Sequence, residues 1–177
     1  MDLGVISVRY ARALLKSAAE LKCEEKVCRD MMCLGRSYLE VPQLRVAIAN
    51  PMLQAEKKKL LLITAAGVEP IELTRRFLDL VLKEGREKAL QFMAASYVTL
   101  YRKQKNITSG RLITATAVTP EIEDRMRRMV ESKTRGTVEF NTEIDPDIIG
   151  GFILEYDTYR MDASVKTGLR KILAELK

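Results

Sequence analysis

Apolar residues up to Lys105 recur at steps of three and four, which is the period of an α-helix. Breaks between these runs fall at Pro42, Asn50-Pro51, Gly67 and Gly85-Arg86. A break at a proline fits a helix end, because the residue before proline is pushed out of the helical region. The pattern predicts six helices with short connections, which must pack as a compact bundle to bury their apolar faces.

The first of these helices carries two apolar stripes. One stripe consists of Ile6, Tyr10, Ala13, Leu14, Ser17 and Leu21, and the other of Val8, Ala11, Leu15 and Ala19. With two apolar sides, this helix is expected to be covered over most of its surface.

The pattern changes after Lys105, where residues 106–110 read as a linker. The segments that follow are, in order, a Thr- and Val-rich strand at 111–118, a helix that starts at Thr119-Pro120, an alternating strand at 138–144, a strand at 151–156 and an amphipathic helix from Val165 to Leu176. The sequence therefore predicts an α+β protein, mostly α. A six-helix bundle over residues 1–105 precedes a small β-α-β-β-α domain over residues 111–177.

The composition is that of an ordinary globular protein, with 47% hydrophobic and 31% charged residues. No window approaches the roughly 20 apolar residues that span a bilayer, so no direct membrane insertion is expected. The opening at Met1-Asp2 leaves no room for a secretory signal. Cys23, Cys28 and Cys33 are odd in number, and their spacing on a helix turns successive thiols apart, so neither disulfides nor a shared metal is predicted. We expect a soluble protein that stays inside the cell.

The net charge of +6 is unevenly distributed. Residues 1–105 hold 19 Lys and Arg against 12 Asp and Glu, whereas residues 106–177 hold 11 against 12. A basic front part suggests an acidic partner surface on a protein, a nucleic acid or a lipid. A basic helical nucleic-acid-binding protein is therefore an alternative, although few aromatic residues are present to stack on bases.

The sequence offers little for catalysis. There is no histidine, and neither glycine-rich phosphate-binding motif occurs. Asp145 and Asp147 flank a proline, as turn residues do, while Asp162 and Ser164 suit the cap of the following helix. An enzyme that works through carboxylates or Ser164 remains the second alternative. We predict no catalytic residue, no metal and no cofactor.

Several motifs taken together resemble one known family. From Asp145 to Ile153 the chain contains an apolar pair, Gly150-Gly151 and the start of a strand, followed by Asp162-Ala163-Ser164 and Leu169. This order resembles the C-terminal signature of the delta subunit of bacterial and chloroplast ATP synthases, called the oligomycin-sensitivity-conferring protein in mitochondria. The segment with Tyr10, Ala13 and Leu14 is similar to the family's opening Tyr-Ala-x-Ala-Leu. Ala163 departs from the usual glycine, so the turn there must either avoid a positive φ or tolerate some strain.

The resemblance spans nearly the whole chain and implies a non-catalytic stator subunit of a rotary, proton-translocating F-type ATP synthase. In that family the N-terminal domain sits on the catalytic F1 head and grips the N-terminal helix of an alpha subunit. The C-terminal domain holds the b subunits of the peripheral stalk, so that the head resists the torque of the rotor. The resemblance also implies a monomer within a hetero-oligomeric complex, peripheral on the cytoplasmic face of a bacterial cell membrane, with no nucleic acid bound.

If this family role applies, the second stripe of the first helix is expected to form one wall of a groove for the alpha-subunit helix. Its proposed lining is Val8, Ala11, Leu15 and Ala19, opposite Phe77 and Val81 of the fifth helix. The alternative is that the first helix is simply the central helix of the bundle. The final helix is a second candidate surface, although its apolar stripe is expected to pack on its own sheet.

Overall fold

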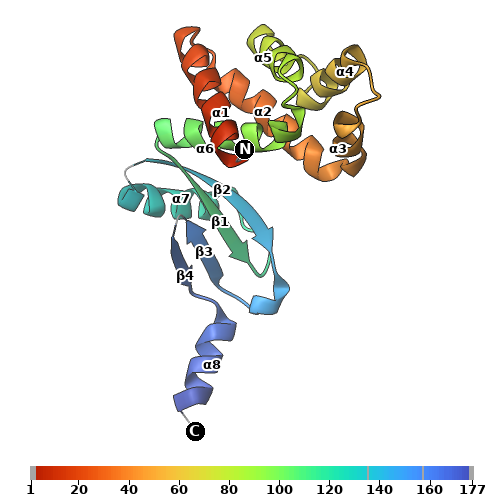
Figure 1. Ribbon diagram of the computed structural model, residues 1–177. Coiled ribbons are helices and arrows are strands. Elements are labelled where there is room, and N and C mark those ends of the chain that lie inside the picture. The colour runs from red at the N-terminus through yellow and green to blue at the C-terminus, as the bar shows by residue number, and fades with distance from the viewer. Residues whose placement is uncertain (1–2, 135, 157, 176–177) are drawn as a thin grey trace. The chain divides into compact units, whose positions relative to one another are not determined.

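The computed structural model describes residues 3–134, 136–156 and 158–175, which divide into two compact units, Met1–Tyr101 and Arg102–Lys177 (Figure 1). The helices of the first unit (unit 1) are α1 (Leu3–Glu20), α2 (Glu24–Glu40), α3 (Pro42–Ala49), α4 (Ala55–Ala66), α5 (Glu72–Lys83), the one-turn η1 (Glu87–Ala89) and α6 (Leu90–Gln104). The last three residues of α6, 102–104, fall within the second unit. The second unit (unit 2) contains β1 (Ile107–Thr114), α7 (Pro120–Thr134), β2 (Thr137–Ile144), the one-turn η2 (Pro146–Ile148), β3 (Phe152–Tyr156), β4 (Tyr159–Asp162) and α8 (Val165–Glu175). The α+β fold class is confirmed.

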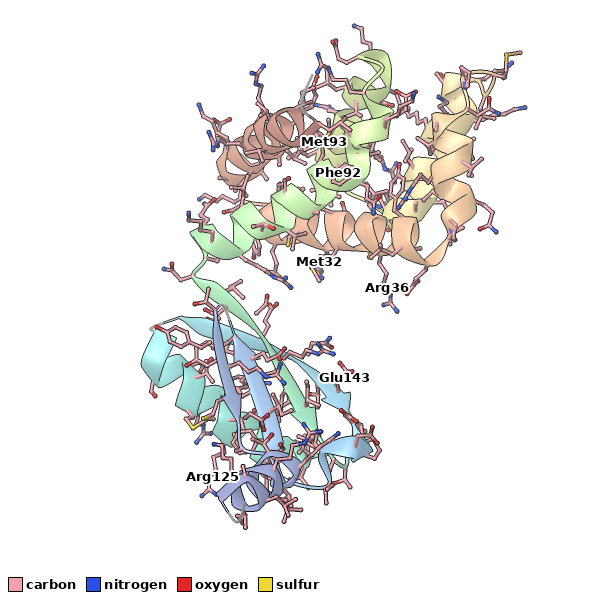
Figure 2. All side chains as sticks on the ribbon, turned by 60° about the horizontal axis from the view of Figure 1, so that its bottom comes forward. Met32, Arg36, Phe92, Met93, Arg125 and Glu143 are labelled. Carbon is pink, nitrogen blue, oxygen red and sulfur yellow. The ribbon has the colours of Figure 1, made fainter. Side chains whose placement is uncertain are left out.

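Unit 1 is built around one apolar core, to which α1 through α6 all contribute. Its largest fully buried side chains are Tyr97, Met31, Leu34, Ile48, Leu62, Leu78, Leu90 and Met93. Burying one such aliphatic side chain contributes roughly 1.5–3 kcal/mol. Adjacent residues on α6 face opposite ways: Met93 lies in the core and is 1% exposed, whereas Phe92 faces outward and is 52% exposed (Figure 2).

The start of α5 is capped by a residue from another helix. The carboxylate of Asp30 on α2 accepts hydrogen bonds from the backbone N–H of Ile71, at 3.1 Å, and from the hydroxyl of Thr74, at 2.6 Å. Ile71 itself has no side chain able to cap α5. Asp30 thus fixes one end of α5 against α2.

Unit 2 is a four-stranded mixed sheet of order β2-β1-β3-β4. β1 and β2 run parallel and are joined through α7, while β3 pairs antiparallel with both β1 and β4. One face packs on α7 through a cluster of Leu112, Val130, Val138 and Leu154, flanked by Met126, Met129 and Phe140. A smaller cluster of Ile113, Ile148 and Ile153 lies at the other face.

Three details of the predicted second domain are wrong. The strand expected at 111–118 ends at Thr114. Residues 107–110 belong to β1 and pair with residues 137–140 of β2, so they are no linker. The polar residues Thr, Ser and Gly at 108–110 do not resemble a strand in sequence. The chain leaves α6 at Asn106, whose φ is +53°, and enters β1 directly. The strand β4 was also missed, because three of its four residues are exposed and leave no apolar alternation to detect. The order is therefore β-α-β-β-β-α.

Candidate partner-binding surfaces

A groove runs between α1 and α5 of unit 1. Its volume is about 410 Å3, and it is lined by Arg9, Tyr10, Ala13, Leu14, Ser17, Leu73, Arg76, Phe77, Leu80 and Glu84. The lining is mainly apolar, and Leu80 is 47% exposed in the free chain. Exposed apolar side chains gathered in a groove mark a surface for another apolar segment.

Aromatic packing fixes the floor of this α1–α5 groove. The rings of Tyr10 and Phe77 meet edge to face, with centroids 6.5 Å apart. The guanidinium of Arg86 lies 5.7 Å from the centroid of the Tyr10 ring, a cation–π arrangement. These contacts hold Tyr10 in place, so the floor is formed before any partner arrives.

The groove lies between the two helices predicted to form it. The side of α1 that lines it is the first apolar stripe, which includes Tyr10 and Ala13, and not the second stripe that was predicted. Ala11 and Val81 are fully buried and Leu15 is 8% exposed, so these three belong to the core. Val8 is exposed, Ala19 is half-buried, and Phe77 contributes to both core and groove. The motif residues Tyr10, Ala13 and Leu14 line the groove. Both stripes have the same helical period, so periodicity alone could not decide which one faces inward.

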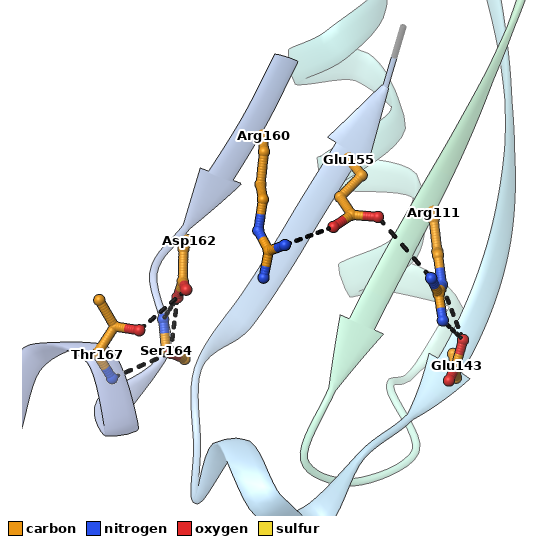
Figure 3. Close-up of polar contacts among 7 residues, drawn as sticks. All are labelled: Arg111, Glu143, Glu155, Arg160, Asp162, Ser164 and Thr167. Atoms are coloured by element: carbon orange, nitrogen blue, oxygen red, sulfur yellow. Dashed lines mark hydrogen bonds and ion pairs between the residues drawn. The ribbon is translucent and has the colours of Figure 1, made fainter. Parts of the chain in front are cut away.

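In unit 2, Asp162 and Ser164 form the cap of α8 (Figure 3). Asp162 accepts hydrogen bonds from the Ser164 backbone N–H at 3.0 Å, from the Ser164 hydroxyl at 2.6 Å and from the Thr167 hydroxyl at 2.9 Å. The Ser164 hydroxyl oxygen accepts from the Thr167 backbone N–H at 3.3 Å. The hydrogen bonds from Ser164 lower the pKa of Asp162. This geometry confirms the capping role expected from the sequence.

Gly150 and Gly151 allow the start of β3 to lie close to the cap of α8. Gly151 has a φ of +75°, and a Cβ there would lie 2.2 Å from the carbonyl oxygen of Ala163. Gly150 accepts a hydrogen bond from the Val165 backbone N–H at 3.0 Å, and a Cβ there would lie 3.1 Å from a Val165 methyl. Ala163 avoids a positive φ, which accounts for the tolerated departure from glycine.

The apolar stripe of α8 is exposed rather than packed on its own sheet, so that expectation is wrong. The exposed fraction is 44% at Val165, 48% at Leu169, 55% at Ile172 and 62% at Leu173. Leu176, expected to complete the stripe, lies outside the described residues. Val165, Leu169 and Ile172 are spaced by four and three residues, so they lie along one side of α8. We call this row the α8 seam, and apolar rows with this spacing pack against other helices.

The sheet face opposite α7 explains why α8 does not pack there. A row of charges crosses all four strands on this face: Glu143, Arg111, Glu155 and Arg160 (Figure 3). Arg111 pairs with Glu143 and lies 3.9 Å from Glu155, which in turn lies 3.2 Å from Arg160. An apolar helix laid over this row would remove these charges from water, which is unfavourable. Sequence spacing gave no sign of the row, because each strand supplies one member.

The described residues contain no group of three or more His, Cys, Asp or Glu placed to hold a metal. The three cysteines are free thiols. In the part of the chain that the structure describes, no helix is long and apolar enough to cross a membrane.

Both units present exposed apolar helix surfaces, as proteins that bind other proteins do. A family model described as the ATP synthase delta (OSCP) subunit matches residues 6–176. The ATP synthase subunit delta of Phocaeicola vulgatus is 49% identical over 173 residues, covering 97% of this chain and 94% of the relative. That of Parabacteroides distasonis is 42% identical over 172 residues, covering 97% and 96%. The chain belongs to the ATP synthase delta (OSCP) subunit family.

The fold is also shared with a chain of the Toxoplasma gondii mitochondrial ATP synthase hexamer. The TM-score is 0.66 at 20% identity, with 96% of each chain covered. Membership of the family makes this chain a non-catalytic subunit of the peripheral stalk, the stator of an F-type ATP synthase. The comparisons give no support to the nucleic-acid-binding alternative.

Proposed function

We propose that the six-helix unit 1 holds the N-terminal helix of an alpha subunit of the F1 head in the α1–α5 groove, while unit 2 holds the b subunits. The chain then acts as one monomer in the complex, peripheral on the cytoplasmic face of a bacterial cell membrane. The groove is the observation that carries the proposal. It is apolar, open and bounded by two helices, as helix-in-groove recognition requires.

Substitution within the groove tests the first half of the proposal. Leu80→Asp introduces a charge that a bound apolar helix face would bury, and Leu80 is exposed enough in the free chain for the fold to tolerate the change. We expect calorimetric titration with a peptide of the alpha-subunit N-terminus to show an affinity loss of roughly 30-fold, as for a hot-spot residue. Leu15 is unsuitable as a probe, because it belongs to the core.

Leu60→Asp is the matched control, since Leu60 is 65% exposed on α4 and does not line the groove. Its affinity should remain within about twofold of the parent chain, because surface changes away from an interface have small effects. An unmodified chain that fails to bind the peptide, or a Leu80→Asp chain that binds normally, would contradict the assignment of the groove.

The exposed seam of α8 supports the second half of the proposal. Changing both Leu169 and Ile172 to Asn should weaken binding of a b-subunit segment by tenfold or more, because each substitution removes apolar area from the contact. The control changes Leu39 and Val46 to Asn, because both are 71% exposed in unit 1. Equal binding by the two double variants would remove α8 from the stalk contact.

A further inference from the structure

The exposed face of α1 carries a row of cations beside the groove. Arg9, Arg12 and Lys16 follow one another at steps of three and four residues, and all three are exposed. Together with Val5 and Val8 they border a shallow hollow of about 750 Å3. The one acidic residue among the helix residues Leu3–Glu20 is Glu20, beyond the end of the row.

Among the described residues, the arginines of this row lack a partner, unlike the other arginines of unit 1. Residues 1–101 contain eight arginines. Six are engaged: Arg29 with Glu25, Arg36 with Glu40, Arg76 with Glu72, Arg45 with Gln91, Arg75 with the carbonyl of Pro70 and Arg86 with the ring of Tyr10. For Arg9 and Arg12 the described residues supply neither an acid, nor a hydrogen-bond acceptor, nor a ring. Two neighbouring unpaired arginines, one turn apart, are therefore available to an external acid.

The row also runs along the groove rather than away from it. Arg9 lines both the groove and the shallow hollow, and Ala13 lies in both linings. From Arg9 to Lys16 the row covers about 10 Å of α1, since each residue rises about 1.5 Å. A helix lying in the groove along α1 would present one flank to this row, with side chains one turn apart facing successive cations.

We propose that the segment bound in the α1–α5 groove is an acidic amphipathic helix. Its apolar face fills the groove, and carboxylates spaced one turn apart along one flank face Arg9, Arg12 and Lys16. The inference rests on the proposed function, which places a helix in the groove. A protein segment fits better than a nucleic acid, because a phosphate backbone would leave the apolar groove beside the cations unfilled.

Exposed charges at the rim of a contact act mainly on the rate of association and on its dependence on salt. The apolar groove supplies most of the affinity, and the row of cations selects which apolar helix binds, because an uncharged or basic helix gains nothing from it. Removing these cations should therefore slow association, and only for a ligand helix that carries carboxylates.

The experiment uses the full chain and two peptides: the alpha-subunit N-terminal segment of the same organism, and the same segment with each Asp changed to Asn and each Glu to Gln. The variant is the double substitution Arg9→Gln and Arg12→Gln. The control is Arg29→Gln and Arg36→Gln, which removes the same charge from α2, where both arginines already have partners. Association rates are measured by stopped-flow fluorescence at low and high salt.

At low salt, the Arg9/Arg12 variant should bind the acidic segment about fivefold more slowly than the parent chain, as for two exposed ion pairs. The deficit should shrink at high salt, and the neutralised peptide should bind the variant and the parent at equal rates. Equal binding of both peptides to both proteins, or a native segment without carboxylates, overturns the acidic-helix inference and leaves the groove as a helix site. If neither peptide binds the parent chain, the proposed function itself fails.

Discussion

Lys58 and Glu87 form an ion pair that is almost hidden from water. The Lys58 Nζ lies 2.8 Å from a Glu87 carboxylate oxygen, with side-chain exposures of 8% and 17%. Burial is the largest single influence and works against the ionised form of Glu87. The hydrogen bond from Lys58, a backbone hydrogen bond at Glu87 and the charges of Lys58 and Lys88 together outweigh it, so the pKa of Glu87 is lowered. Among the described residues, the second carboxylate oxygen of Glu87 and the hydroxyl of Tyr38 are buried without a hydrogen-bond partner. The pair joins α4 to η1 at the cost of incomplete hydrogen bonding.

Removing one member of this pair should destabilise unit 1 more than removing both. Lys58→Met leaves the Glu87 carboxylate uncompensated, and we expect the free energy of unfolding to fall by about 3 kcal/mol. Adding Glu87→Leu should restore most of that loss, because an apolar pair of similar volume replaces the ions. Urea denaturation of the two single variants and the double variant checks the cycle. Additive losses would show that the charges do not act as a pair.

The cap of α8 should weaken in acid. Because the pKa of Asp162 is lowered below its ordinary value of 3.8, its carboxylate stabilises the folded state fully above that value. The contribution is lost as the pH falls through the lowered pKa. Asp162→Ala should therefore unfold more easily than the parent chain at about pH 6, and the difference should shrink as the pH falls below 3.8.

Asp147→Ala is the matched control, since it removes an exposed carboxylate of unit 2 that the α8 cap does not use. Circular dichroism against urea at each pH provides the measurement. A difference between Asp162→Ala and the parent chain that persists unchanged in acid would show that Asp162 acts through packing rather than through its charge.

The sequence predicted which segments form helices and strands more accurately than it predicted which face of each element is buried. The breaks at Asn50-Pro51 and Gly67 are local events, so the ends of α3 and α4 could be predicted closely. The inward face of α1 depends on what the rest of the bundle packs against it. Residues 11 and 15 are buried, whereas Tyr10 and Ala13 face a groove, although all four fall on apolar stripes of equal period.

The surface of unit 2 was predictable only in part, for a related reason. The seam of α8 was recognised in the sequence, but its exposure was not, because the charges that keep it off the sheet come from four separate strands. Side chains that meet only through strand pairing leave no spacing signal in a single sequence. Likewise, the sequence could not show that Arg9 and Arg12 lack a partner among the described residues, because the fold decides which acids and acceptors lie near each arginine.

The molecule as a whole contains separate cores in its two units. All buried residues of the first cluster lie within residues 1–101, and those of the other two clusters lie within residues 102–177. The units should therefore respond separately to core substitutions. Leu154→Ala should destabilise unit 2 by about 2–5 kcal/mol while leaving unit 1 unaffected.

Leu34→Ala is the reciprocal variant, since Leu34 is fully buried in unit 1. It should expose the amides of unit 1 alone when hydrogen exchange is followed residue by residue. A loss of protection in both units from either substitution would show that the two cores unfold as one.

The capped start of α8 also has a mechanical consequence. The helix is 11 residues long, which corresponds to an arm of about 16 Å. Its first turn is anchored by Asp162, Ser164 and Gly150, and the exposure of its apolar residues increases towards the far end. A sideways pull near Leu173 therefore acts with leverage on a few hydrogen bonds at the pivot. Under load, the connection should yield first at that pivot, before any strand of the sheet separates.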